Sequence, residues 1–117
     1  MKLENTKIQM RKGVLEYCIL TIISRGEVYT SDILSSLKDA KLLVVEGTVY
    51  PLLTRLKNAG LLSYEWKEST SGPPRKYFQL TPVGESFLDE LGDTWDELVH
   101  AVHVTTKNVQ TTKSAES

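Results

Sequence analysis

The stretch from Gly47 to Leu62 constrains the fold more than any other part of the chain. Its apolar residues recur near the 3.6-residue period of a helix, and Gly60 then supplies a stop before a turn into a strand. The apolar edge is formed by Val49, Leu52, Leu53, Leu56 and Leu61. The opposite edge is short, polar or basic, has no acid after Glu46, and consists of Gly47, Pro51, Thr54 and Asn58, flanked by Tyr50, Arg55 and Lys57. A helix built this way can lie close against a polyanion, as a helix in the major groove of DNA must do.

Two helices are predicted before this stretch. The first runs from about Gln9 to Ser24, and its apolar surface is wide enough to be buried on more than one side. Gly26 stops it, and Thr30-Ser31-Asp32 offers N-cap oxygens for a second helix. The buried face of that second helix would consist of Ile33, Leu34 and Leu37.

The third helix is predicted to begin near Val45 or Glu46 and to stop at Gly60. Pro51 forfeits the hydrogen bond to the carbonyl of Gly47, whose missing side chain relieves crowding there. We therefore expect a distorted or 3₁₀-like first turn rather than a broken helix.

A β-hairpin is predicted to follow. Residues 62–68 alternate apolar and polar side chains, as a half-buried strand does. Residues 69–74, Ser-Thr-Ser-Gly-Pro-Pro, are expected to form a loop, and residues 75–80 return as a second strand with a basic start. Three helices and such a hairpin describe a winged helix-turn-helix over residues 1–80, in a mainly α fold of the α+β class.

A last helix is predicted over residues 81–104, with Thr81 as its N-cap and Pro82 at its first position. Its apolar residues recur at steps near three and four over a length that the small domain beside it cannot cover: Phe87, Leu88, Leu91, Trp95, Leu98, Val99 and Val102. Such a row needs a partner surface, and a second copy of the chain is the simplest source. Residues 105–117 are too polar to pack and are expected to be a disordered tail.

Charge is divided unevenly along the chain. Residues 1–80 hold 12 Lys or Arg against 8 Asp or Glu, a net charge of +4, and residues 81–117 hold 2 against 7, a net charge of −5. The basic part suits a phosphate backbone, although chance segregation of surface charge gives the same pattern. A single cysteine, a polar N-terminus and the absence of a long apolar run predict a cytoplasmic protein without a membrane partner.

These motifs resemble the PadR family of bacterial transcriptional regulators. The resemblance covers roughly residues 10–104 and is carried by Gly47-Thr48-Val49-Tyr50-Pro51-Leu52-Leu53, Arg55-Leu56, Gly60-Leu61-Leu62, Trp66, Gly72, Arg75-Lys76-Tyr77-Phe78, Leu80-Thr81 and Gly84. The chain departs from the family at Thr30-Ser31, where a Gly-Tyr pair is usual, and at Val45, where serine or asparagine is frequent. The single short C-terminal helix resembles the shorter branch of the family.

The resemblance implies a homodimeric repressor that binds double-stranded DNA at an inverted-repeat operator. It also implies that the C-terminal helix packs against the N-terminal helix of the partner copy, which adds Val14 and Tyr17 to the dimer interface. In some members an aromatic residue at a place like that of Trp95 stacks on flat ligands, so Trp95 is a candidate contact for a small planar ligand that relieves repression. Interface core remains the simpler interpretation of Trp95.

Candidate DNA contacts come from three places. The major-groove helix supplies Gly47, Thr48, Tyr50, Thr54, Arg55 and Lys57. The wing supplies Arg75 and Lys76, which are otherwise ordinary strand charges, and the start of the second helix supplies Thr30 and Ser31, which N-capping explains equally well. Tyr50 could instead pack against the wing.

Other functions have less support in the sequence. His100 and His103 lie three apart, but no Cys, Asp or Glu completes an obvious metal site, and no cofactor is expected. Cys18 lies in an apolar helix, and few residues could form a nucleophile and base, so an enzyme is disfavoured. Two alternatives to a DNA-binding repressor stay open, namely a winged-helix interaction module without DNA binding and a ligand or metal sensor.

Overall fold

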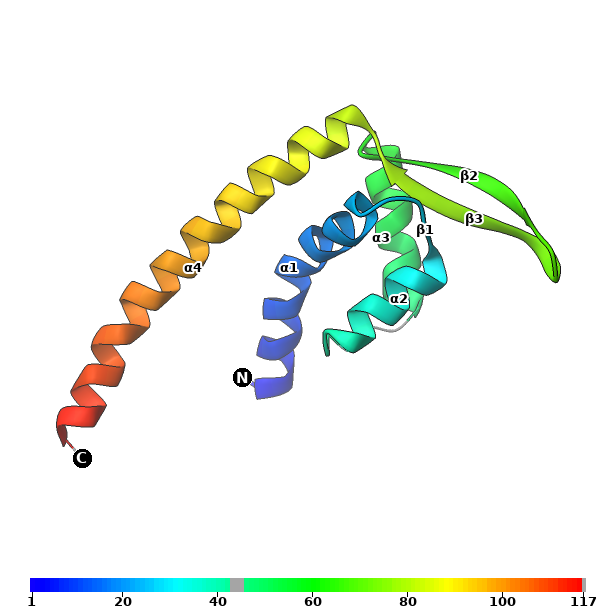
Figure 1. The fold of residues 1–117 in the computed structure, drawn as a ribbon. Helices are drawn as coiled ribbons and strands as arrows, with labels where there is room; N and C mark the ends of the chain where they lie inside the picture. Colours follow the sequence, from blue (N-terminus) through cyan, green and yellow to red (C-terminus); the bar gives the residue numbers. More distant parts are fainter. Residues whose placement is uncertain (43–45, 117) are drawn as a thin grey trace.

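The computed structural model describes the backbone of residues 1–42 and 46–116 and the side chains of residues 1–42 and 47–107. The elements follow in the order α1 (Leu3–Ser24), β1 (Val28–Tyr29), α2 (Thr30–Asp39), α3 (Glu46–Asn58), β2 (Leu62–Ser69), β3 (Gly72–Leu80) and α4 (Pro82–Glu116). Helices α1 to α3 gather at the base of the β2–β3 hairpin, while the hairpin and α4 leave this body in different directions (Figure 1). The predicted α+β winged-helix architecture is therefore confirmed.

The core lies where α1, α2, α3 and the base of the hairpin meet. Its fully buried side chains are Ile19, Leu20, Ile23, Ile33, Leu37 and Val49. Helix α1 contacts α2, β3 and α4, because its wide apolar surface is covered from several sides, as the sequence predicts. The predicted buried edge of α3 is also present, with Val49, Leu53 and Leu56 all inaccessible.

Two helices are longer than the sequence analysis expects. Helix α1 begins at Leu3 rather than near Gln9, in a segment without Gly or Pro, with Glu4 in its first turn and a Glu4–Lys7 ion pair of 3.7 Å. Helix α4 continues to Glu116, through the segment expected to be a tail. Each residue added to a growing helix gains one backbone hydrogen bond. No Gly or Pro follows Gly92, so nothing in the sequence interrupts α4.

The hairpin belongs to a three-stranded antiparallel sheet with the order β1-β3-β2. Strand β1 was not predicted, because two residues are too few for a period-2 pattern. The loop predicted over residues 69–74 is wrong, since only Thr70 and Ser71 lie between β2 and β3. Between the pairs Lys67↔Arg75 and Ser69↔Gly72, strand β3 has one residue more than β2, and this bulge accommodates two consecutive prolines in the strand.

The predicted caps are right at α4 and wrong at α2. Thr81 caps α4, because its Oγ1 accepts a hydrogen bond of 3.0 Å from the Gly84 N–H. At α2 the N-cap is Tyr29, one residue earlier than predicted, and Asp32 Oδ2 accepts a 2.9 Å hydrogen bond from the Tyr29 N–H.

Helix α3 ends as predicted, but its first turn differs from the prediction. It stops at Asn58, before Gly60 at φ 83°. Residues Glu46–Asn58 are α-helical throughout, without the expected 3₁₀-like turn, because Pro51 removes a single hydrogen bond near the helix start. A Cβ at Gly47 would meet no atom of the Pro51 ring within 4 Å, so this glycine relieves no crowding against the ring. Val45, the earlier of the two predicted starts, lies outside the described residues.

None of the described helices is long and apolar enough to cross a membrane.

Candidate nucleic-acid interface

The polar edge of α3 is open to solvent. Gly47, Thr48, Thr54, Arg55 and Lys57 are exposed, and the Tyr50 side chain is 49% exposed rather than packed as core. The buried residues of α3 lie on the opposite side of the helix and anchor it to the core. The arrangement leaves one whole face of α3 available to a macromolecule, as the sequence analysis expects.

A groove of about 240 Å³ separates this face from the wing. Helix α3 lines it with Tyr50, Thr54, Lys57 and Asn58, the hairpin with Tyr64, Lys76 and Phe78, and α2 with Thr30. Four elements therefore bring candidate residues from all three predicted places to one concavity. Tyr64 was missed by the sequence analysis, because its strand position indicates only a half-buried residue.

Two lysines, Lys57 and Lys76, face this groove. The Lys57 ammonium lies 5.3 Å from the centroid of the Tyr64 ring, and the Lys76 ammonium lies 3.8 Å from it. Among the described side chains, neither lysine forms an ion pair. Neither ammonium charge is therefore balanced by a carboxylate within this part of the chain.

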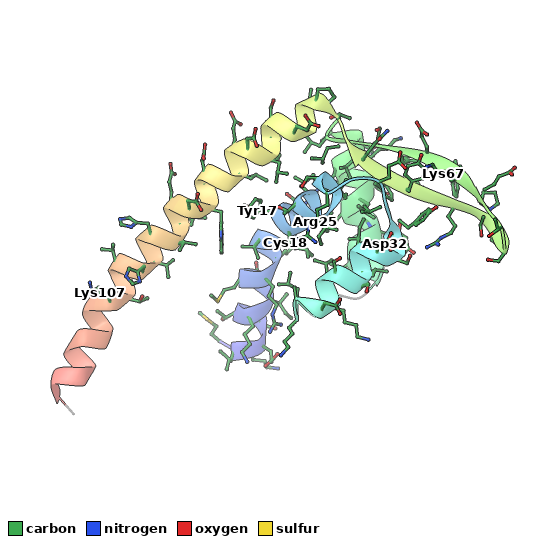
Figure 2. The ribbon with its side chains drawn as sticks, in the orientation of Figure 1. Tyr17, Cys18, Arg25, Asp32, Lys67 and Lys107 are labelled. Carbon is green, nitrogen blue, oxygen red and sulfur yellow. The ribbon has the colours of Figure 1, made fainter. Side chains whose placement is uncertain are left out.

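Arg75 and Ser31 meet at the start of α2. The Arg75 Nη2 donates a hydrogen bond of 2.6 Å to Ser31 Oγ, and the guanidinium carbon lies 3.9 Å from the centroid of the Tyr29 ring. Asp32 lies one residue farther along, in the first turn of α2 (Figure 2). Arg75 is thus held by the protein itself, with its charge beside the start of α2.

Arg55 points toward α1, where it forms an ion pair with Glu16. Arg55, Gly47 and Thr48 line a hollow of about 310 Å³ together with Lys12 of α1. Lys12 and Glu16 carry no sequence signal for this site, because neither lies near the predicted recognition helix in the chain. The structure therefore extends the candidate interface onto α1.

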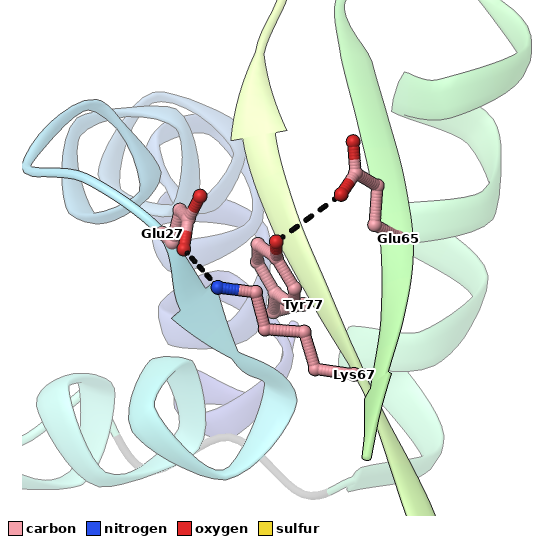
Figure 3. Close-up of polar contacts among 4 residues, drawn as sticks. All are labelled: Glu27, Glu65, Lys67 and Tyr77. Atoms are coloured by element: carbon pink, nitrogen blue, oxygen red, sulfur yellow. Dashed lines mark hydrogen bonds and ion pairs between the residues drawn. The ribbon is translucent and has the colours of Figure 1, made fainter.

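Lys67, the remaining lysine of the hairpin, is committed to an internal contact (Figure 3). Its Nζ lies 2.8 Å from Glu27 Oε2 and 4.4 Å from the centroid of the Tyr77 ring, and the Tyr77 hydroxyl donates a 3.2 Å hydrogen bond to Glu65. The hydrogen bond to Glu27, and next that to Tyr77, raise the pKa of Lys67. For Tyr77, the hydrogen bond from Lys67 lowers the pKa, but burial and the charges of Glu27 and Glu65 prevail and raise it. This cluster links the hairpin to the loop after α1.

The predicted dimer residues divide into two groups. Leu88 and Leu91 pack against the core of their own protomer, and the Tyr17 and Trp95 rings lie 6.3 Å apart, with Tyr17 on the side of α1 that faces α4 (Figure 2). The outer group is open in the protomer: Phe87 is 38% exposed, Trp95 40%, Leu98 52%, Val99 47% and Val102 59%. Trp95, Leu98, Val99 and Val102 share a mostly apolar groove of about 710 Å³ with Val14 and Met10 of α1.

The described residues contain no group of three His, Cys, Asp or Glu side chains that could hold a metal ion. Burial raises the pKa of the Cys18 thiol, which disfavours its reactive thiolate form.

Comparisons with known proteins agree with this geometry. A family model described as "Transcriptional regulator PadR-like family" matches residues 19–90. A PadR-like transcription factor from Bacteroides fragilis is 63% identical, with a TM-score of 0.72, over 85% of this chain and 96% of that chain. A PadR-like regulator from Bacillus cereus is 41% identical, with a TM-score of 0.73, over 81% and 93%. Bacillus subtilis PadR, solved in complex with operator DNA, is 26% identical, with a TM-score of 0.61, over 67% of this chain and 46% of that chain.

Proposed function

Because this chain belongs to the PadR-like family of transcriptional regulators, we propose that it is a homodimeric repressor that binds an inverted-repeat operator in double-stranded DNA. The observation that carries the proposal is the exposed edge of α3 together with Lys57 and Lys76, neither of which pairs with an acid among the described side chains. The operator complex of Bacillus subtilis PadR supports DNA as the partner. In this proposal α3 enters the major groove, and the wing and the start of α2 contact the flanking phosphates.

The chain is divided by function in the same proposal. Residues 1–80 carry the basic charge and contact DNA, and residues 81–104 form the dimer through the exposed apolar row of α4 against α1 of the partner copy. A two-fold dimer places two recognition helices about 34 Å apart, so that both reach one face of the duplex. The acidic α4 points away from the phosphates. Such a regulator acts where the bacterial chromosome is, in the cytoplasm.

A small planar ligand is a second part of the proposal. The groove that contains Trp95 is mostly apolar, and a flat aromatic molecule can stack on the exposed indole ring. Because the groove lies between α1 and α4, a ligand there would change how the two copies pack and hence the spacing of the recognition helices. A winged-helix interaction module without DNA binding is the alternative.

The test is binding of the purified protein to duplexes that it selects from random DNA, followed by fluorescence anisotropy across a salt series. About 6 phosphate contacts per dimer give a log–log salt slope of roughly −5. The variant with both Arg55→Ala and Arg75→Ala should lose binding and remain a dimer by light scattering. Salt-independent binding, or no selected sequence at all, would overturn the proposal in favour of the interaction module.

A further inference from the structure

The ring of Tyr64 lies between two elements of the interface. Lys57 belongs to the last turn of α3, and Lys76 lies on β3. The ring of Tyr64 belongs to β2, and its centroid lies 5.3 Å from the Lys57 ammonium and 3.8 Å from the Lys76 ammonium. Tyr64 is itself half-buried, packs against the core and lies 6.0 Å from the Phe78 ring. A ring anchored in this way provides a fixed surface for two flexible side chains.

The contact positions the lysines without neutralising them. An aromatic ring attracts an ammonium group through its quadrupole, whereas a carboxylate would cancel the charge. Two other cations of this surface pair with acids instead, Arg55 with Glu16 and Lys67 with Glu27. Lys57 and Lys76 are therefore pre-ordered and still able to bind an anion.

Pre-ordering matters because a free lysine side chain loses much rotamer freedom when a phosphate fixes it. If the ring restricts both lysines beforehand, less of this freedom is lost on binding. The same ring also couples the end of α3 to the wing, so that the two elements meet the duplex in a constant relative position.

We infer that Tyr64 is a positioning residue of the DNA interface, which holds Lys57 of α3 and Lys76 of the wing on one ring for binding to the phosphate backbone. This inference rests on the proposed function. Tyr64 itself acts through the two lysines and need not touch DNA.

The experiment uses the full chain and the duplex selected by the wild-type protein, with affinities measured across a salt series. Tyr64→Leu removes the ring and should weaken binding roughly tenfold, with an unchanged salt slope, because the lysines still reach phosphates. Tyr64→Phe keeps the ring and should bind like the wild type. Lys57→Met and Lys76→Met should each lower the magnitude of the salt slope by roughly 2, since the dimer carries each lysine twice.

A double-mutant comparison separates positioning from packing. In the Lys57→Met, Lys76→Met background, Tyr64→Leu should have no further effect on affinity, because nothing remains for the ring to position. A full tenfold loss in that background overturns the inference, as does wild-type affinity of Tyr64→Leu alone.

The remaining outcomes are also decisive. If Tyr64→Leu does not fold by circular dichroism, an unchanged salt slope in both lysine variants overturns the inference, and a reduced slope in both supports it. If the wild-type protein binds no duplex, the proposed function fails and this inference fails with it. Wild-type binding with no role for the ring removes the inference alone.

Discussion

At the scale of single residues, Gly84 decides how closely α4 approaches the body of the protein. A Cβ at this position would lie 2.1 Å from the carbonyl oxygen of Leu61 and 3.0 Å from its carbonyl carbon. Both are backbone atoms at the junction between α3 and β2, so neither can move cheaply. Only glycine allows the first turn of α4 to pack against this junction.

We therefore expect Gly84→Ala to lower the free energy of unfolding by about 3 kcal/mol, because the junction must shift. Gly13→Ala is the matched control, since Gly13 is an exposed α1 residue whose added Cβ would meet no atom within 4 Å. The control should raise the free energy of unfolding by about 0.5–1 kcal/mol through helix propensity. Urea unfolding of the two variants measures both changes, and similar effects would contradict the packing argument.

Lys41 is the one described residue other than glycine with a positive φ, at 62°. It ends α2, where the Leu42 N–H donates a 3.0 Å hydrogen bond to the Leu37 carbonyl. This conformation is unfavourable for an L-residue with a side chain and natural for glycine. Lys41→Gly should raise the free energy of unfolding by about 1 kcal/mol in thermal denaturation. Lys38→Gly, one turn earlier and inside α2, should lower it by about 1 kcal/mol, and a loss in both variants would contradict the prediction.

At the scale of elements, Thr81 joins three segments. Its hydroxyl donates a 2.6 Å hydrogen bond to the Gly60 carbonyl and accepts one of 3.0 Å from the Gly84 N–H. The Thr81 N–H also donates to the Leu61 carbonyl, at 3.1 Å. The end of α3, the end of β3 and the start of α4 therefore meet at one side chain.

Replacing Thr81 with Val keeps the side-chain shape but removes both hydroxyl hydrogen bonds. Thr81→Val should lower the free energy of unfolding by about 1–2 kcal/mol, chiefly through loss of the N-cap. Thr81→Ser retains the hydroxyl and serves as the control, with a change below about 0.5 kcal/mol. Equal destabilisation by Val and Ser in urea titrations would contradict the prediction, because Ser keeps the hydroxyl that Val lacks.

At the scale of the whole molecule, α4 gives the chain its length. The principal extents are 63 × 29 × 23 Å, because α4 leaves the winged helix as an arm (Figure 1). The apolar side chains that this arm exposes to solvent are the physical basis of the proposed dimer.

Leu98→Glu combined with Val102→Glu should therefore convert the protein to a monomer, as measured by light scattering. Because the two half-sites would then bind independently, affinity for the full operator should fall roughly 100-fold. Val83→Glu places a charge on α4 at a residue that is 63% exposed and outside the apolar row, and it should remain dimeric. A dimeric double variant would show that this row is not the interface.

Much of the fold follows from local sequence patterns. Residues within a few positions of one another set several features that the structure contains. These are the helix ends before Gly26 and Gly60, the N-cap at Thr81 and the two faces of α3. The prolines at 73 and 74 predict a loop, but they lie in strand β3, because the bulge between β2 and β3 accommodates them. Strand β1 was missed because it exists only through pairing with β3.

By itself, the sequence determined the order of the elements and the exposed edge of α3, because periodicity, caps and glycine stops act over a few residues. Only the tertiary structure decided which side chain each cation contacts. Arg75 meets Ser31 across 44 residues of chain, Lys67 meets Glu27 across 40, and Tyr64 gathers Lys57 and Lys76 from two different elements. Such contacts depend on how finished helices and strands pack together, and no local pattern in the chain specifies that packing.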